Sequence, residues 1–192
     1  MADFSISNSK TKAHEGGYAN DHHDRGGETY RGIARNFHKD WAGWSIIDNY
    51  KSFNDFPKNL ESLQQLQRLI DSFYKKEFWD KMRLDELGYQ SVADELYDNA
   101  VNAGIKNSVL FLQKALNLLN NSESFYKNIK EDGELGLITM KTLNDCLRIR
   151  SITLLLNLVN YHQMEHYVNL MKKKEVHEKY IGWFNRVEIT KG

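Results

Sequence analysis

Apolar residues recur at intervals of three and four along much of the chain, which is the period of a helix with one buried face. The first such stripe covers residues 60–74 and is built mainly of leucine. Asn54 or Asp55 precedes it as a candidate N-cap, and Pro57 suits the first turn. We therefore expect one helix that begins after this cap and continues to residue 74.

Two further stripes follow each other closely in the second half of the chain. Ser91 can open one helix, with Asp94 three residues later as in a capping box, and Gly104 can end it. The next stripe covers residues 105–119. Beyond it we expect a loop over residues 120–136, a helix that starts at Thr139, and one or two helices over residues 151–189.

The N-terminal quarter differs, because six of the twelve glycines fall between residues 16 and 43. Glycine permits positive φ and close backbone approach, so this segment is expected to be rich in turns. A helix over residues 5–15 would end at the first glycine pair, and residues 29–34 are expected to form one strand of a small hairpin. Together the patterns predict an α+β fold that is mainly α, with a small β-hairpin next to the first helix.

The amino-acid composition argues against several classes of function. Of the 192 residues, 41% are hydrophobic and 27% are charged, as in a globular domain. The 26 basic residues balance the 26 acidic ones, which removes the usual electrostatic case for binding nucleic acid or an anionic membrane. The single cysteine, Cys146, excludes an internal disulfide framework and a zinc site built on cysteines, and we expect it to be buried.

No targeting or membrane-spanning segment is evident in the sequence. The first thirteen residues are polar, and the longest apolar stretch, residues 152–159, is too short to cross a bilayer. We expect a chain that is made in the cytoplasm without a signal peptide and does not insert into the membrane. Residues 147–192 carry eight basic and four acidic side chains, an excess that suits either a polyanionic cell wall or a solvated helix face.

The glycine-rich segment also holds the candidate chemistry. Glu15 lies at the expected helix end, Asp24 follows on the loop, and Thr29 comes five residues later. Glycoside hydrolysis uses two carboxyl groups, one protonated and the other ionised. A helix-borne Glu15 suits the protonated role and a loop-borne Asp24 the ionised one, with Thr29 as a holder of the attacking water. In the structural alternative, the two carboxylates only bond loop amides.

Other side chains leave alternatives open. His22 and His23, beside two aspartates, could hold a metal ion, but adjacent histidines seldom point the same way on an extended loop, so no metal is expected. Trp41 and Trp44 could stack on sugar rings, although three-residue spacing is more typical of one buried helix face.

Residues 14–33 resemble the signature of glycoside hydrolase family 108. The shared order is E-G-G-Y, then N-D, a variable pair, D, G-G-x-T and G-I, and this sequence has two histidines where many relatives begin the variable pair with proline. The resemblance implies that Glu15 is the catalytic acid, and it places Asp24 and Thr29 at the family's second aspartate and its threonine. The family is similar to phage endolysins and lysozymes with N-acetylmuramidase activity on peptidoglycan.

The resemblance continues, in order, to the end of the chain. Segments within residues 78–104 resemble the helical half of the same domain. The D-G-x-x-G-x-x-T pattern of residues 132–139 and the G-W-x-N-R-V pattern of residues 182–187 resemble a predicted peptidoglycan-binding module. The implied organisation is a lysozyme-like catalytic domain over residues 1–107 and a helical module over residues 108–192 packed on it.

The resemblance implies hydrolysis of the bond between N-acetylmuramic acid and N-acetylglucosamine, with glycan strands of peptidoglycan as the partner and no cofactor. Glu15 would protonate the glycosidic oxygen, while Asp24, helped by Thr29, would direct water to the anomeric carbon. An endolysin made in the cytoplasm would need a holin or an export system to act at the cell wall. The residues expected to contact the sugars are Tyr18, Asn20, Tyr30, Asp98 and Asn102.

Three other functions stay open at the level of sequence. A lytic transglycosylase cuts the same bond with a lone glutamate and leaves a 1,6-anhydro sugar. A non-catalytic protein that binds the wall or assists secretion is the second, since proteins of this type have also been named secretion activators. A metal-dependent enzyme built on His22 and His23 is the third and the weakest.

Overall fold

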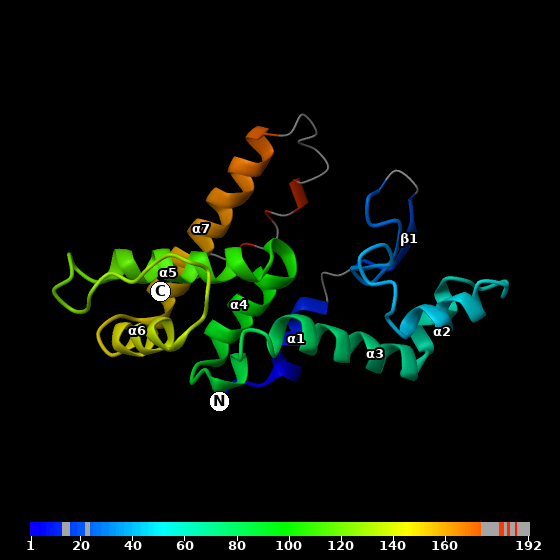
Figure 1. The fold of residues 1–192 in the computed structure, drawn as a ribbon, viewed down its shortest axis with the longest axis horizontal. Coiled ribbons are helices and arrows are strands. Elements are labelled where there is room, and N and C mark those ends of the chain that lie inside the picture. Colours follow the sequence, from blue (N-terminus) through cyan, green and yellow to red (C-terminus); the bar gives the residue numbers. More distant parts are fainter. Residues whose placement is uncertain (13–15, 22–23, 174–180, 183, 185–186, 188–192) are drawn as a thin grey trace. The chain divides into compact units, whose positions relative to one another are not determined.

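The computed structural model describes residues 1–12, 16–21, 24–173, 181–182, 184 and 187, and Figure 1 shows its ribbon. The chain divides into two compact units, Phe4–Lys81 and Met1–Asp3 with Met82–Gly192. The first unit contains α1 (Phe4–Lys12), β1 (Tyr18–Asn20), β2 (Glu28–Tyr30), β3 (Ile33–Ala34), α2 (Gly43–Tyr50), η1 (Lys58–Ser62), α3 (Gln64–Tyr74) and η2 (Lys75–Trp79). The second contains η3 (Leu84–Glu86), α4 (Gln90–Ala103), α5 (Ile105–Leu119), α6 (Leu137–Leu147) and α7 (Ile152–Lys173).

The small sheet is antiparallel and has the order β1-β2-β3. Tyr18 pairs with Tyr30 between the first two strands, and the turn from β2 to β3 consists of Arg31 and Gly32, with φ values of 48° and 77°. Two consecutive residues with positive φ match the twist of a tight hairpin. The prediction of one strand over residues 29–34 is therefore wrong, because the chain reverses at its centre and forms two strands.

The leucine stripe of the first unit is interrupted. Residues before Leu63 form the 3-10 helix η1 and those after it form α3, while Leu63 itself is extended at φ −79° and ψ 95°. Leu60 and Leu66 are fully buried on either side of the break. The predicted single helix with a side-chain cap is therefore wrong: the carboxylate of Asp55 instead accepts a hydrogen bond from Asn59, at 2.8 Å. The helical spacing of the apolar residues is kept across the break because η1 and α3 face the same core.

Polar contacts attach α1 to the rest of its unit. Its buried residues are Ser7, Asn8 and Thr11, and its apolar contact is the ring of Phe4 edge-on to Trp79, with centroids 5.7 Å apart. Asn8 Nδ2 donates to Asp71 Oδ1 on α3 at 2.6 Å, and Lys12 forms an ion pair with the same carboxylate. The predicted helix over residues 5–15 is described as far as Lys12, and residues 13–15 lie outside the described part of the chain.

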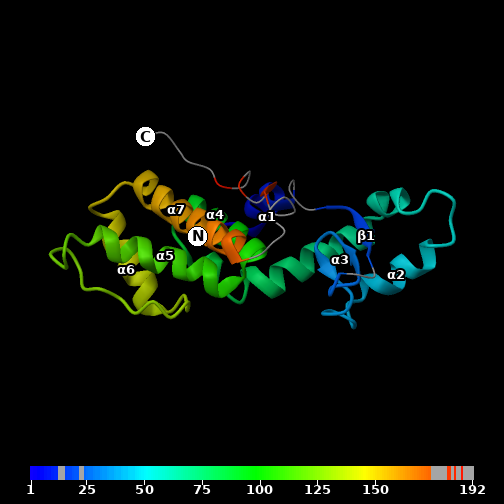
Figure 2. The same ribbon diagram turned by 90° about the horizontal axis from the view of Figure 1, so that it is seen from above.

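The second unit is helical in all its described elements. Helix α5 packs against both α4 and α7, which the two views of Figure 1 and Figure 2 show from perpendicular directions. The chain turns from α4 into α5 at Gly104, whose φ is 87°, as the predicted helix end requires. The predicted capping box is wrong, because α4 begins at Gln90, which donates to Asp94 at 2.7 Å, and Ser91 lies within the helix. Helix α6 begins two residues before the predicted Thr139.

The D-G-x-x-G-x-x-T segment is held by one buried amide, that of Gln113 on α5. Its Nε2 donates to Asp132 Oδ1 at 2.9 Å and lies 3.2 Å from Thr139 Oγ1, and its Oε1 accepts the N–H of Gly133 at 2.9 Å. Gly133 has φ 77°, and a Cβ there would lie 2.8 Å from the carbonyl oxygen of Lys106. The residues of this motif are therefore explained by the contacts that hold the loop on α5. Cys146 is buried, as predicted.

None of the helices in the described part of the chain combines the length and the apolar character needed to cross a bilayer.

Replacing Gln113 by leucine should lower the free energy of unfolding by about 1–3 kcal/mol, because the buried N–H of Gly133 loses its acceptor without access to water. Urea unfolding followed by circular dichroism measures the change. Asn144→Ala, at an exposed position on α6, is the control and should change stability little. Equal stability of the two variants would contradict the assigned role of Gln113.

Candidate active site

Asp24 organises the loop between β1 and β2. Its Oδ1 accepts the N–H of Gly26 at 2.9 Å, and its carbonyl accepts the N–H of Gly27 at 3.0 Å. The side chain therefore closes an Asx turn while the residue stays exposed to solvent. An exposed carboxylate can hold a turn and still present its second oxygen to water.

Two adjacent glycines let this loop lie directly on β3 and the segment that follows it. A Cβ on Gly26 would lie 3.0 Å from Cβ of Ala34, and Gly27 has φ 63° with its Cβ position 2.8 Å from Asn36 Nδ2. Asn36 in turn donates its side-chain amide to the carbonyl of Arg25 at 3.0 Å. The G-G of the sequence motif is thus explained by close packing at the first position and by backbone conformation at the second.

Thr29 on β2 lies close to the Asp24 carboxylate. The position of a Cβ on Gly26 is 3.5 Å from Asp24 Oδ1 and 3.6 Å from Thr29 Oγ1, so these oxygens are at most about 7 Å apart. The Thr29 hydroxyl donates its proton to the carbonyl of Gly27 at 3.1 Å, which leaves its lone pairs to accept. The structure therefore brings together two of the three predicted catalytic residues.

Glu15, the third, lies outside the described residues, as do His22 and His23. Among the residues that are described, no group of three or more His, Cys, Asp or Glu side chains could hold a metal ion.

The three hairpin residues that are expected to contact sugars lie in different environments. Tyr18 is half-buried, donates its hydroxyl to Glu28 Oε1 at 3.0 Å and packs edge-on against Phe56. Asn20 is exposed at the end of β1. Tyr30 is 1% exposed and belongs to the core, where Gln67 approaches its hydroxyl at 3.5 Å. Its ring therefore supports the hairpin from inside and does not line the surface.

Asp98 and Asn102 lie on α4, in the second unit. They are one helical turn apart, and Asn102 Nδ2 donates to Asp98 Oδ2 at 3.0 Å and to the Asp98 carbonyl at 2.7 Å. The two side chains therefore stabilise each other locally.

Trp41 and Trp44 do not share a helix face, contrary to the expectation from their spacing. Trp44 lies in the first turn of α2 and is 4% exposed, whereas Trp41 precedes the helix and is partly exposed. Their rings meet edge to face with centroids 5.1 Å apart. Trp41 therefore lies at the surface next to the core.

A charge cluster around Glu28 was missed by the sequence analysis. The Glu28 side chain is 10% exposed and forms ion pairs with Lys51 at 2.8 Å and with Nε of Arg35 at 2.9 Å, the latter outside hydrogen-bond geometry. Arg35 also makes two hydrogen bonds to Asp48 on α2, at 3.0 and 2.7 Å. Glu28 and the buried Tyr30 point to the same side of β2, since strand side chains alternate, and that pattern was the available signal.

The cluster shifts the ionisation of its members. The hydrogen bond from Arg35 holds the pKa of Asp48 below its usual value, and the same bond raises the pKa of Arg35. Burial raises the pKa of Tyr18, and its hydrogen bond to Glu28 adds to this shift. At neutral pH the Tyr18 hydroxyl is therefore a proton donor, and Asp48 and Arg35 carry opposite charges.

Comparison with known proteins matches two families to successive parts of the chain, and the first match crosses the boundary between the two compact units. Residues 9–104 match the family described as glycosyl hydrolase 108. The chain belongs to the glycosyl hydrolase 108 family. Residues 107–188 match a predicted peptidoglycan domain, so the function is peptidoglycan-associated and lysozyme-like, in agreement with the resemblance found in the sequence.

One solved structure supports the fold of this family member. Brucella abortus SagA aligns with a TM-score of 0.58 and 22% identity over 96% of this chain and 88% of its own. At that identity the likeness shows the fold alone, and it agrees with the predicted lysozyme-like, mainly α architecture. No curated protein sequence matches the chain.

The lowered pKa of Asp48 has a consequence for stability. A carboxylate whose pKa is lower in the folded state adds stability above its unfolded pKa, near 3.8, and loses it as the pH falls through the folded pKa. Asp48→Asn should therefore be less stable than wild type at pH 7, by at most about 1 kcal/mol because the pair is half exposed, and the difference should shrink as the pH falls below the unfolded pKa and through the lowered folded pKa. Thermal unfolding from pH 2.5 to 7 measures it. Asp40→Asn is the control, and a pH-independent difference for Asp48→Asn would contradict the linkage.

Proposed function

We propose that this protein is a muramidase that hydrolyses the glycosidic bond from N-acetylmuramic acid to N-acetylglucosamine. The observation that carries the proposal is the convergence of the Asp24 carboxylate and the Thr29 hydroxyl around Gly26, inside the segment that matches the glycosyl hydrolase family. Hydrolysis of this kind needs an ionised carboxylate next to a place for water, and the exposed loop provides both.

Each residue has a stated part in the reaction. Glu15 donates a proton to the glycosidic oxygen, so that the leaving sugar departs as an alcohol. Asp24 accepts a proton from the attacking water, and Thr29 Oγ1, which already donates to Gly27, accepts the other hydrogen of that water and orients it. The product is a reducing N-acetylmuramic acid end, with no cofactor involved.

The rest of the chain serves binding. Tyr18 and Asn20 contact the glycan beside the loop, and Asp98 and Asn102 do so from α4, in a catalytic domain of residues 1–107. Residues 108–192 form a module that keeps the enzyme on the wall, consistent with the match of residues 107–188 to a peptidoglycan domain. The enzyme acts at the cell wall as an endolysin does, after release through a holin or an export system.

The first test is mass spectrometry of the fragments released from purified sacculi. Wild type should release fragments with reducing N-acetylmuramic acid ends, and Glu15→Gln should release them about 10²–10⁴ times more slowly, because general acid catalysis is lost. Anhydro ends would assign the protein to the transglycosylases instead. Sacculus binding without release by either protein would favour a non-catalytic wall or secretion role.

Asp24→Asn separates catalysis from loop structure. An asparagine oxygen can still accept the N–H of Gly26, so the Asx turn and the fold should survive. The release rate should fall about a hundredfold or more, because the amide cannot accept a proton from water. Asp21→Asn, at the exposed neighbouring aspartate, is the matched control. Turnover by Asp24→Asn equal to that of the control would remove Asp24 from the mechanism.

A further inference from the structure

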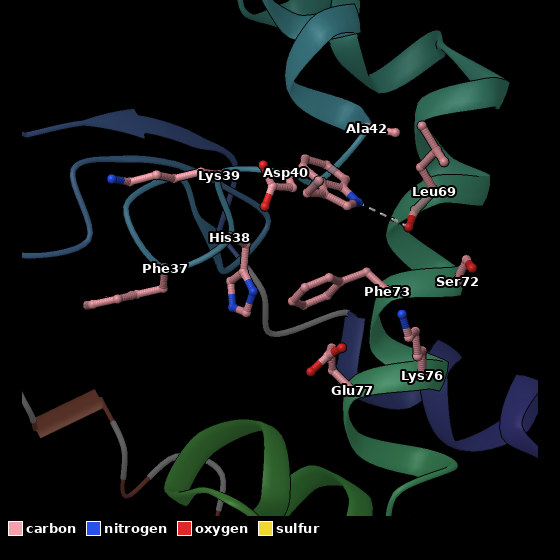
Figure 3. Close-up of a pocket in the computed structure, with 11 residues that line it drawn as sticks. Phe37, His38, Lys39, Asp40, Ala42, Leu69, Ser72, Phe73, Lys76 and Glu77 are labelled. Atoms are coloured by element: carbon pink, nitrogen blue, oxygen red, sulfur yellow. Dashed lines mark hydrogen bonds between the residues drawn. The ribbon is translucent and has the colours of Figure 1, made fainter.

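A hollow of about 400 Å³ lies in the first unit, between the loop of residues 37–42 and the helical wall of α3 and η2 (Figure 3). His38 and Trp41 line it from the loop, and Phe73 and Glu77 line it from the helices. Figure 3 shows Phe73 extending from α3 toward the loop, with the carboxylate of Glu77 below it. The hollow therefore has aromatic walls and an acidic edge at Asp40 and Glu77, with Lys39 and Lys76 also among its lining residues.

The aromatic walls are fixed in place. The ring of Phe73 lies edge-on to His38, with centroids 4.7 Å apart, and 6.4 Å from Trp41. Trp41 Nε1 donates to the Leu69 carbonyl at 3.4 Å, and its indole lies so close over Gly43 that a methyl group there would overlap the ring. A pocket held in this way loses little conformational entropy when a ligand enters.

The acidic edge offers a hydrogen-bond acceptor. Glu77 Oε2 binds Lys81 at 2.5 Å, and this bond holds the pKa of Glu77 below its usual value. Glu77 lies in η2, a π-helical turn closed by the bond from the N–H of Asp80 to the carbonyl of Lys75 at 2.8 Å. Such turns are rare and frequently occur at functional sites.

The hollow continues directly from the hairpin. Ala34 is the residue on which Gly26 packs, and its carbonyl accepts the N–H of His38 at 3.0 Å. One turn of backbone thus joins the loop of Asp24 to the wall of the hollow. Phe37, which is 68% exposed, also lines the hollow.

We propose that this hollow is a subsite for one N-acetylhexosamine ring of a peptidoglycan glycan strand. The electron-rich faces of Trp41 and Phe73 meet the C–H face of the sugar, and the Glu77 carboxylate accepts a hydrogen bond from a hydroxyl or amide N–H. The proposal rests on the proposed muramidase function and adds a binding position beyond the reacting bond.

The test measures binding of a peptide-free tetrasaccharide, two repeats of N-acetylglucosamine and N-acetylmuramic acid, to the full chain carrying Glu15→Gln, which prevents cleavage. Titration followed by ¹H–¹⁵N NMR should shift the indole N–H of Trp41. Glu77→Ala and Trp41→Ala, added singly, should each weaken binding about tenfold, as expected for loss of a charged hydrogen bond or an aromatic contact. Cellotetraose, which lacks N-acetyl groups, should bind more weakly.

Matched controls lie in the same unit outside the hollow. Phe53→Ala removes an aromatic ring that is 57% exposed, and Glu61→Ala removes a carboxylate whose side chain is 68% exposed. Both should bind within about twofold of the parent. If Trp41→Ala fails to fold, the comparison of Glu77→Ala with Glu61→Ala decides.

Equal binding by the hollow variants and the controls would overturn the subsite. Absence of tetrasaccharide binding, in a protein whose wild type digests sacculi, would also overturn it while leaving the muramidase intact. Absence of both binding and digestion would overturn the subsite together with the function on which it rests.

Discussion

The geometry of the candidate site depends on one nearly buried carboxylate, Glu28. It draws Tyr18, Arg35 and Lys51 together, and Arg35 extends the cluster to Asp48 on α2. Strands of two or three residues bury little apolar surface beyond Tyr30 and Ile33, so these charges add to the attachment of the sheet. Because Arg35 and Lys51 both pair with Glu28, the nearly buried carboxylate remains compensated as long as one of these cations is present. The loop that carries the catalytic candidates is fixed as a result.

Hydrogen bonds and ion pairs also hold other segments of the chain in place. Asp71 attaches α1, the helix that precedes Glu15, through Asn8 and Lys12, and Gln113 seats the D-G-x-x-G loop on α5. Apolar packing is tolerant of small shifts, whereas a buried donor or acceptor must meet its partner at a defined position. The helices therefore pack through their apolar faces, and the segments expected to act on peptidoglycan are placed by hydrogen bonds and ion pairs.

The sequence predicted the apolar helices better than the segments that are placed by polar contacts. Helix α5 was predicted with its observed bounds, and the end of α4 at Gly104 was also predicted, because apolar period and glycine are local signals. The turn at Arg31 and Gly32 was not predicted, since it is held from a distance by the hydroxyl of Tyr74, which donates to the Arg31 carbonyl at 2.6 Å. At the candidate site, the motif predicted roles for Asp24 and Thr29, and both lie next to Gly26 in the structure. It could not show that Tyr30, the residue after Thr29, faces the core.

The most direct test of the account is a crystal structure of the Glu15→Gln protein with the peptide-free peptidoglycan tetrasaccharide. We expect the glycan to cross the hairpin, with its scissile bond between residue 15 and Asp24 and a neighbouring sugar ring against Trp41 and Phe73. A glycan bound solely to residues 107–188, with the hairpin unoccupied, would contradict it.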